Sequence, residues 1–202
     1  MFILFLYAMT SNALQVSELR SGDLLLQPID CNICKVIQKE ENSPYAHVGI
    51  FVPDAEGNPI VLEAVNDGVH ATKLADFMSR TSKTIKVKVI RSKTALLCGN
   101  EQQCQKNLLS TFNTQFKGLA YNDDFLWDAH DLQGRPKLYC SQLVYQLLNP
   151  FLTSKFSTKK MHYKVSRKKW VEYFHHQPPD GLPGLSPGDI DRNPGFKSLG
   201  FL

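Results

Sequence analysis

The sequence has no apolar run long enough to cross a membrane as a helix. Its most apolar segment, MFILFLYAMTSNA at residues 1–13, is too short and ends on small residues of the kind that a signal peptidase reads. The lysine or arginine usual near the start of a signal peptide is missing. We expect residues 1–13 to be a signal peptide, with a buried first strand as the alternative. Residues 14–202 are then exported, to the periplasm or outside the cell.

The sequence also lacks a helix-turn-helix, an RNA-binding signature and a glycine-rich phosphate loop. Its formal net charge is only +4, so nothing predicts a nucleic-acid partner. The basic residues are partly clustered, and such a cluster most often forms a solvated face. Contact with an anionic cell-wall or lipid surface is the alternative. The cluster consists of Lys155, Lys159, Lys160, Lys164, Arg167, Lys168 and Lys169.

Internal repeats and linker-like segments are absent as well, and 43% of the residues are hydrophobic, so we expect one α+β domain. Ile85, Val87 and Val89 alternate in a predicted strand and should face inward, and Thr72 should cap a short helix at 74–80. From residue 177 onward, frequent proline and glycine predict an extended tail. The expected strands are 23–27, 46–52, 60–64, 69–72 and 83–91, and the longer helices are 101–116, 140–148 and 166–175.

Cysteine is scarce, and its count of five is odd. Cys31 and Cys34 form one local pair and Cys98 and Cys104 a second, which leaves Cys140 over. In an exported chain this predicts two structural disulfides and one free, reactive thiol. The alternatives are disulfides across the pairs, a zinc ion on the four thiolates and redox activity of the CxxC motif. We rank disulfides first and expect no metal, because oxidation removes zinc ligands and no strand–CxxC–helix pattern surrounds the motif.

Cys140 stands at the start of a predicted helix, in the run LYCSQLVYQLL, where apolar residues follow at helical spacing. The free N–H groups and the dipole of a first helical turn favour a thiolate. His47 lies well upstream in YAHVGIF, which predicts a short buried strand with one imidazole. A cysteine at a helix N-terminus that faces a histidine on a strand is the arrangement of papain-like thiol hydrolases.

The histidine precedes the cysteine, which is the reverse of papain. This order, with the motifs around it, resembles the circularly permuted branch of the NlpC/P60 superfamily, in particular the YiiX/YebB-like cysteine hydrolases. The similarity extends over roughly residues 17–202. It is carried by GDLL at 22–25, AHVGI at 46–50 (SHVGI in the family), VLEA at 61–64, GLAYN at 118–122 (GxxYD in the family), YCSQLV at 139–144 (YCSELV in the family) and SPGDI at 186–190.

The resemblance implies an α+β, circularly permuted papain-like fold, with an antiparallel sheet packed against helices and the nucleophile at a helix N-terminus. It implies catalysis by Cys140 and His47. Glu63 is our candidate for the group that orients His47, because the hairpin between them would pair their strands. If the register of the hairpin differs, Asn66 or Asp67 takes this role.

A tetrahedral oxyanion on the substrate needs a second donor besides the backbone N–H of Cys140. Tyr45 is two positions from His47 and is therefore expected on the same face of the strand. Tyr45 or Tyr121 would supply this donor or line the cleft.

The resemblance implies hydrolysis of an amide or acyl bond through a cysteine thioester, without a metal or an organic cofactor. The expected substrate is a peptide or acyl amide, most of all the stem peptide of peptidoglycan in the cell wall. A lipid or protein N-acyl amide hydrolase or an acyltransferase of the same fold is the first alternative. The second is a non-catalytic module that binds cell wall or a partner, against which an unpaired reactive thiol argues.

Overall fold

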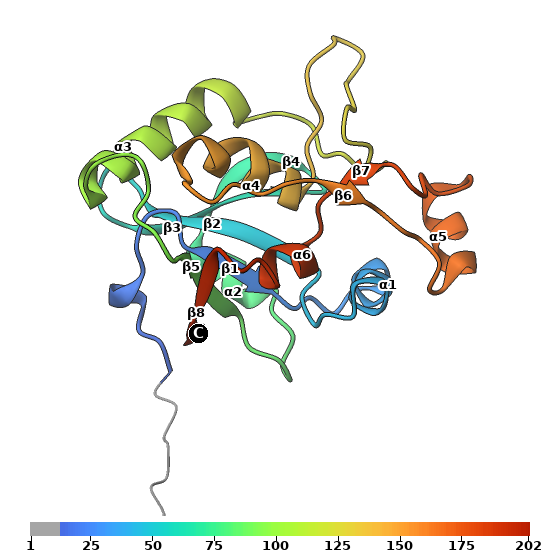
Figure 1. Ribbon diagram of the computed structural model, residues 1–202, viewed down its shortest axis with the longest axis horizontal. Coiled ribbons are helices and arrows are strands. Elements are labelled where there is room, and N and C mark those ends of the chain that lie inside the picture. Colours follow the sequence, from blue (N-terminus) through green and yellow to red (C-terminus); the bar gives the residue numbers. More distant parts are fainter. Residues whose placement is uncertain (1–12) are drawn as a thin grey trace, which may run out of the picture.

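The computed structural model describes residues 13–202 (Figure 1), so most of the expected signal peptide lies outside the described residues. The helices are α1 Asn32–Glu41, α2 Leu74–Ser79, α3 Glu101–Thr111, α4 Cys140–Leu148, α5 Arg167–Phe174 and α6 Pro187–Asp191. The strands are β1 Leu24–Gln27, β2 His47–Pro53, β3 Pro59–Val65, β4 Gly68–Lys73, β5 Lys88–Ser92, β6 Lys159–Lys160, β7 Pro183–Gly184 and β8 Phe196–Phe201. In the described part of the chain, every helix is too short or too polar to pass through a membrane.

A six-stranded antiparallel sheet in the order β4-β3-β2-β1-β5-β8 forms the centre of the fold. Helices α3 and α4 lie over one face and α2 over the other (Figure 1). Residues alternate between the faces as a pleated strand requires: Leu24 and Leu26 join the core under α4, whereas Leu25 joins the core around Phe77 of α2. The expected α+β fold, with an antiparallel sheet packed against helices, is confirmed.

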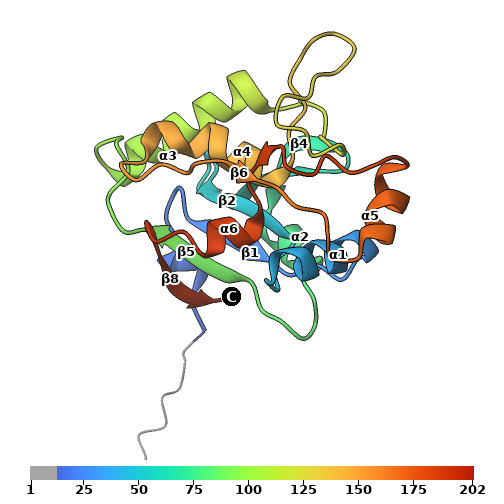
Figure 2. The same ribbon diagram turned by 45° about the vertical axis from the view of Figure 1, so that its right-hand side comes forward.

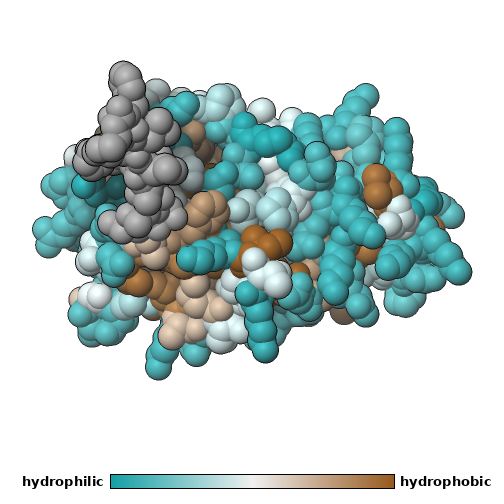
Figure 3. Space-filling view, turned by 90° about the horizontal axis from the view of Figure 1, so that it is seen from below, coloured by the Kyte–Doolittle hydropathy of each residue, from teal (hydrophilic) through white to brown (hydrophobic). Residues whose placement is uncertain are grey.

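The second core, on the α2 side, is less completely covered than the first. Leu14, Met78, Leu199 and Leu202 pack against it and are only partly buried. Figure 3 shows this side from below, and hydrophobic residues gather there in one area beside the residues drawn in grey. The remainder of the visible surface is mainly hydrophilic.

The expected strands and longer helices are present, with two local differences. The last strand of the first half is shorter than expected, since β5 begins at Lys88, and Ile85 is 39% exposed rather than inward. Thr72 does not cap α2, because its hydroxyl donates to the Glu63 carboxylate instead. The basic residues from 155 to 169 in the predicted cluster are exposed.

Two segments of regular structure were not expected from the sequence. The tail after residue 177 contains α6 and also β8, which pairs with β5 at the edge of the sheet. Helix α1 follows the CxxC motif, and Cys31 is its N-cap. The expectation that no strand–CxxC–helix pattern surrounds Cys31 was therefore wrong, since β1 precedes the motif and α1 follows it.

Helix α5 packs against α1 beside the sheet, as Figures 1 and 2 show on the right of the molecule. Their contact is an aromatic cluster that contains Tyr163, Trp170 and Phe174. Glu40 of α1 holds this segment in place, because its carboxylate accepts hydrogen bonds from the backbone N–H groups of Lys164 (3.0 Å) and Val165 (2.7 Å) and from Trp170 Nε1 (3.1 Å).

Two of the motifs noted in the sequence have structural roles. Asp23 of the GDLL motif is buried and accepts hydrogen bonds from the Arg91 guanidinium, at 2.6 Å from Nε, which fixes β1 to β5. Ser186 of the SPGDI motif is the N-cap of α6 and forms a capping box with Asp189. Both residues stabilise the frame around the site.

Candidate active site

Cys140 is the first residue of α4, and only 7% of it is exposed. The helix is fixed by Leu143, Val144 and Leu147, which are fully buried in the core against the sheet. This packing holds the thiol at the end of the helix where N–H groups are free and the dipole is positive. Cys140 is also the free cysteine, because the structure links Cys31 to Cys34 and Cys98 to Cys104.

His47 is the first residue of β2, and its ring contacts the Phe77 ring with the centroids 5.9 Å apart. Its Nε2 atom lies 2.6 Å from Glu63 Oε2. With Glu63 ionised, Nε2 must be the donor of this bond, so Nδ1 is left to face the Cys140 sulfur. The predicted residues Cys140, His47 and Glu63 therefore lie together at the N-terminus of α4.

Glu63 is fully buried on β3, and three donors share its carboxylate. Besides His47, the Thr72 hydroxyl and Arg80 Nη2 each lie 2.5 Å from Oε1. A buried carboxylate with this many donors stays ionised. Burial by itself would raise the pKa of Glu63, but hydrogen bonds and charge attraction from His47 lower it to about 2, with Thr72 and Arg80 contributing.

The pKa values of His47 and Cys140 move in the directions that favour an ion pair. Burial disfavours the charged imidazole, yet hydrogen bonding with Cys140 and Glu63 outweighs it and raises the pKa of His47 to about 9. Burial likewise opposes a thiolate, but hydrogen bonds and charge attraction from His47 lower the pKa of Cys140, helped by Ser141 and the Val48 N–H. Both shifts favour a thiolate on Cys140 beside an imidazolium on His47.

The other predicted site residues separate into two groups. Asn66 and Asp67 are exposed at the turn between β3 and β4 and make no hydrogen bond to His47. Tyr121 lies beside Cys140, and burial followed by the charge of Cys140 raises the pKa of its hydroxyl well above the usual value. Tyr45 was expected on the same face of the strand as His47, and this is wrong. It precedes the paired residues of β2 and packs in the core under α4, whereas the His47 ring contacts Phe77 of the second core.

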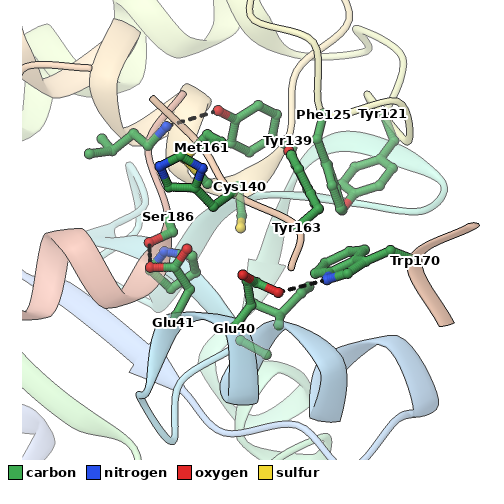
Figure 4. A pocket seen from close by; sticks show the side chains of 15 residues that line it. Glu40, Glu41, Tyr121, Phe125, Tyr139, Cys140, Met161, Tyr163, Trp170 and Ser186 are labelled. Carbon is green, nitrogen blue, oxygen red and sulfur yellow. Dashed lines mark hydrogen bonds between the residues drawn. The ribbon is translucent and has the colours of Figure 1, made fainter. Parts of the chain in front are cut away.

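Two cavities meet at Cys140. The first, of about 520 Å³, lies between α1, α5 and the segment before α6 (Figure 4). The second is a wider, open cavity of about 1510 Å³ along the ends of β2 and β3. Tyr121, Phe125 and Cys140 line both cavities. His47 lines the second cavity and is not among the residues that line the first.

A buried amide network connects the loop before α4 to its first turn. Asn122 Nδ2 donates to Gln142 Oε1 (3.2 Å) and to the Leu126 carbonyl (2.6 Å), and Gln142 Nε2 donates to the Trp127 carbonyl (2.6 Å). Asn122 is the residue where the GxxYD motif has an acid. It fixes the loop that carries Tyr121 and Phe125 at the edge of both cavities.

Several residues of the first cavity were not predicted as site residues. Glu40, Met161 and Tyr163 line it together with Trp170. They come from α1 and from the segment after α4, which the sequence does not relate to Cys140. The aromatic stripe of α5 was the one available signal, and it indicated only a buried helix face.

Comparison with known proteins agrees with this geometry. The sequence matches the Peptidase_C92 family, described as permuted papain-like amidase enzymes, YaeF/YiiX, C92 family, over residues 18–197. The chain belongs to this family. The family match and the site together establish a cysteine hydrolase of the papain-like class that acts on amide bonds. No curated protein sequence matches the chain.

A solved structure shares the fold of this family member. It is YiiX from Escherichia coli O157:H7, described as a metalloprotein, with a TM-score of 0.74 and 23% sequence identity over 91% of this chain and 97% of that one. At this identity the comparison supports the fold alone. It covers the sheet and the helices that position the site.

Proposed function

We propose that this family member cleaves amide bonds with Cys140 as the nucleophile, His47 as the general base and acid, and Glu63 as the group that orients His47. The observation that carries the proposal is the buried hydrogen bond of 2.6 Å between His47 Nε2 and Glu63. It turns the other ring nitrogen toward the thiol at the start of α4. The contact with Phe77 buries the His47 ring, but it does not determine which ring nitrogen faces the thiol. The hydrogen bond to Glu63 does.

In the reaction, the thiolate adds to the amide carbonyl carbon and forms a tetrahedral oxyanion. The C–N bond then breaks, the proton of the His47 imidazolium passes to the leaving nitrogen, and the acyl group stays on sulfur as a thioester. Water adds next as His47 accepts its proton, and breaking of the C–S bond releases the acid and restores the thiolate. The backbone N–H of Cys140 and the Tyr121 hydroxyl donate to the oxyanion.

Cys140→Ala tests the nucleophile. Amide cleavage should fall by ~10³-fold or more, while circular dichroism and melting temperature should change little, because alanine fits the start of a helix. Tyr121→Phe should lower kcat by ~10- to 100-fold with an unchanged rate of thiol alkylation, as expected for loss of one oxyanion donor. A Cys140→Ala variant with half of the activity would exclude the thiol mechanism.

For the substrate, we propose an exported enzyme that acts on peptides of the cell wall. The signal-like residues 1–13 and the two disulfides support export, because such bonds persist in oxidising compartments. N-terminal sequencing of protein recovered outside the cytoplasm should give a start after Ala13. Mass spectrometry of peptidoglycan fragments treated with wild type or with Cys140→Ala should show new stem-peptide termini in the wild-type sample alone.

The metal that the name of the solved YiiX structure implies has no counterpart among the described residues. Among residues 13–202, no three His, Cys, Asp or Glu side chains are grouped so that they could hold a metal ion. Cys31, Cys34, Cys98 and Cys104 are joined as disulfides and offer no thiolates. The residues present therefore do not fit a metal centre, and we assign no step to one.

A non-catalytic binding module is the rival interpretation of the same fold. Iodoacetamide separates the two, since it reacts with the thiolate. Alkylation of Cys140 should stay fast at a lower pH than alkylation of an ordinary thiol, because the pKa of Cys140 is lowered. A rate that falls as it does for an ordinary exposed thiol would favour the binding module.

A further inference from the structure

The two cavities that meet at Cys140 differ in a way that bears on how an amide would lie across the thiol. His47 lines the larger second cavity and not the first one. In amide cleavage the imidazolium must protonate the leaving nitrogen, so that nitrogen must lie on the His47 side of the sulfur. The acyl half of the substrate then lies on the other side.

We propose that the first cavity is the acyl subsite and that it selects an apolar, uncharged acyl group, while the leaving amine lies in the second cavity. This inference rests on the proposed function and adds the direction and class of its substrate. The first cavity is the smaller of the two, at about 520 Å³ against about 1510 Å³ for the second. Met161 lines it but not the second cavity, and Asn66 lines the second but not the first.

The lining of the acyl subsite explains its preference for apolar groups. Aromatic rings surround the thiol in Figure 4 and come from four segments of the chain. They belong to Tyr121, Phe125, Tyr139, Tyr163 and Trp170, with Met161, Ile37 and Leu185 between them. The Tyr139 hydroxyl accepts a hydrogen bond from the Leu185 N–H, which holds this ring in the wall of the cavity.

Two carboxylates at the edge of this subsite work against a negatively charged acyl group. Glu40 is held by two backbone N–H groups and Trp170. Glu41 accepts from the Ser186 hydroxyl and lies 3.4 Å from Arg192 and 3.7 Å from Lys159. Both carboxylates already have donors, so they offer a weak site for an ammonium group but still repel an anion.

The second cavity is larger and its lining is mixed. Asn66, Asp67, Arg80 and Asp123 line it together with apolar side chains, among them Ile29, Ile33 and Val65. Asp67 and Asp123 are largely exposed, so a polar amine can keep part of its hydration there.

The orientation is tested with two amides that exchange their apolar and polar halves, hexanoyl-glycinamide and acetylglycine hexylamide. Met161→Trp, which narrows the first cavity, should lower kcat/KM for hexanoyl-glycinamide at least ~10-fold more than for acetylglycine hexylamide. Intact-protein mass spectrometry should show a hexanoyl adduct on Cys140. An equal or larger loss with acetylglycine hexylamide overturns the assignment of the two cavities.

The charge selection is tested with acyl groups of equal length on glycinamide. The expected order is hexanoyl, then 6-aminohexanoyl, then adipoyl, with adipoyl slower by ~100-fold because its carboxylate is desolvated beside Glu40 and Glu41. From acetyl to hexanoyl, each added methylene should raise kcat/KM about three- to fourfold. Faster cleavage of the 6-aminohexanoyl or adipoyl compound overturns the apolar assignment.

Matched variants locate the selection. Met161→Trp fills the first cavity and should abolish most of the gain in kcat/KM from acetyl to hexanoyl. Asn66→Trp, in the second cavity, should leave the acyl preference unchanged. The same effect from both variants overturns the proposal.

Activated esters keep this inference separate from amide cleavage. The p-nitrophenyl esters of hexanoic acid and of adipic acid acylate a reactive thiol without a need for general-acid help. If the amides are not cleaved but hexanoate acylates Cys140 faster than adipate, and only Met161→Trp removes the difference, the proposed amide hydrolysis fails while the acyl subsite stands. Equal rates for the two esters overturn the acyl subsite.

Discussion

At the scale of single residues, the site depends on a chain of charges from Cys140 through His47 to Glu63. Glu63 is ionised at every pH where the protein works, since its pKa lies at about 2. Its hydrogen bond to Nε2 stabilises the imidazolium, which in turn stabilises the thiolate. Each group therefore sets the titration of the next.

The pH dependence of kcat/KM follows from these directions. Activity needs the thiolate and the protonated imidazole together, so it should be high between the lowered pKa of Cys140 and the raised pKa of His47. It should fall as pH rises through about 9, where His47 loses the proton that the leaving nitrogen needs. A rate profile against pH checks this, and an alkaline limb near the ordinary histidine pKa of about 6.5 would contradict it.

Glu63→Gln separates orientation from substrate binding. The amide keeps the shape but removes the charge, so the alkaline limb should move to lower pH and kcat should fall by ~10- to 1,000-fold. The pH profile of iodoacetamide alkylation should shift upward as the thiol pKa rises. Thr72→Val, which removes another donor from the same carboxylate, is the control and should change both profiles less.

At the scale of elements, β2, the strand that carries His47, lies very close to β3 and to α2 at Gly49. An ideal Cβ at Gly49 would lie 2.3 Å from Val61 Cγ1 of β3 and 3.3 Å from the Phe77 ring. Glycine is thus required where β2 pairs with β3 beside Phe77 of α2. The spacing keeps His47 and Glu63 within hydrogen-bond distance.

Gly49→Ala should therefore cost about 1–3 kcal/mol of stability and also lower the rate of thiol alkylation at neutral pH. Gly57→Ala is the matched control, because its φ of 88° makes alanine strained although the site around it is open. The control should lower the melting temperature without changing the alkylation profile. Urea unfolding and alkylation rates measure the two effects, and loss of stability without a change at Cys140 would separate Gly49 from the site.

The elements also show what could be predicted from the sequence. Strong periodicity identified β1 to β4, α3 and α4, and these carry Cys140, His47 and Glu63. Helix α1 was not predicted because its CxxC motif indicated only a disulfide. Strand β8 was not predicted because it follows many prolines and glycines, which indicate an extended tail. The acyl subsite was not predictable: Glu40, Met161 and Trp170 meet only through the packing of α1 with the segment after α4. The predicted position of Tyr45 was wrong because strand alternation does not continue before His47, the first paired residue of β2.

At the scale of the whole molecule, the two disulfides and the free thiol define which surfaces are fixed and which remain reactive. Both bonds are local, with sequence separations of 3 and 6 residues. On the chain-entropy model, loops this short contribute about 2 kcal/mol each. The Cys31–Cys34 bond lines the open cavity near His47, whereas Cys98 and Cys104 lie at the start of α3.

Non-reducing peptide mapping of the exported protein should show Cys31 linked to Cys34, Cys98 linked to Cys104, and Cys140 free. The double variants Cys31→Ser/Cys34→Ser and Cys98→Ser/Cys104→Ser should both lower the melting temperature, by several degrees each. Only the first should also raise KM, because it changes the wall of the cavity that receives the leaving amine. Discovery of Cys140 in an intramolecular disulfide would contradict both the cysteine assignment and the catalytic one. Equal changes in KM for the two variants would instead show that the Cys31–Cys34 bond acts only through stability.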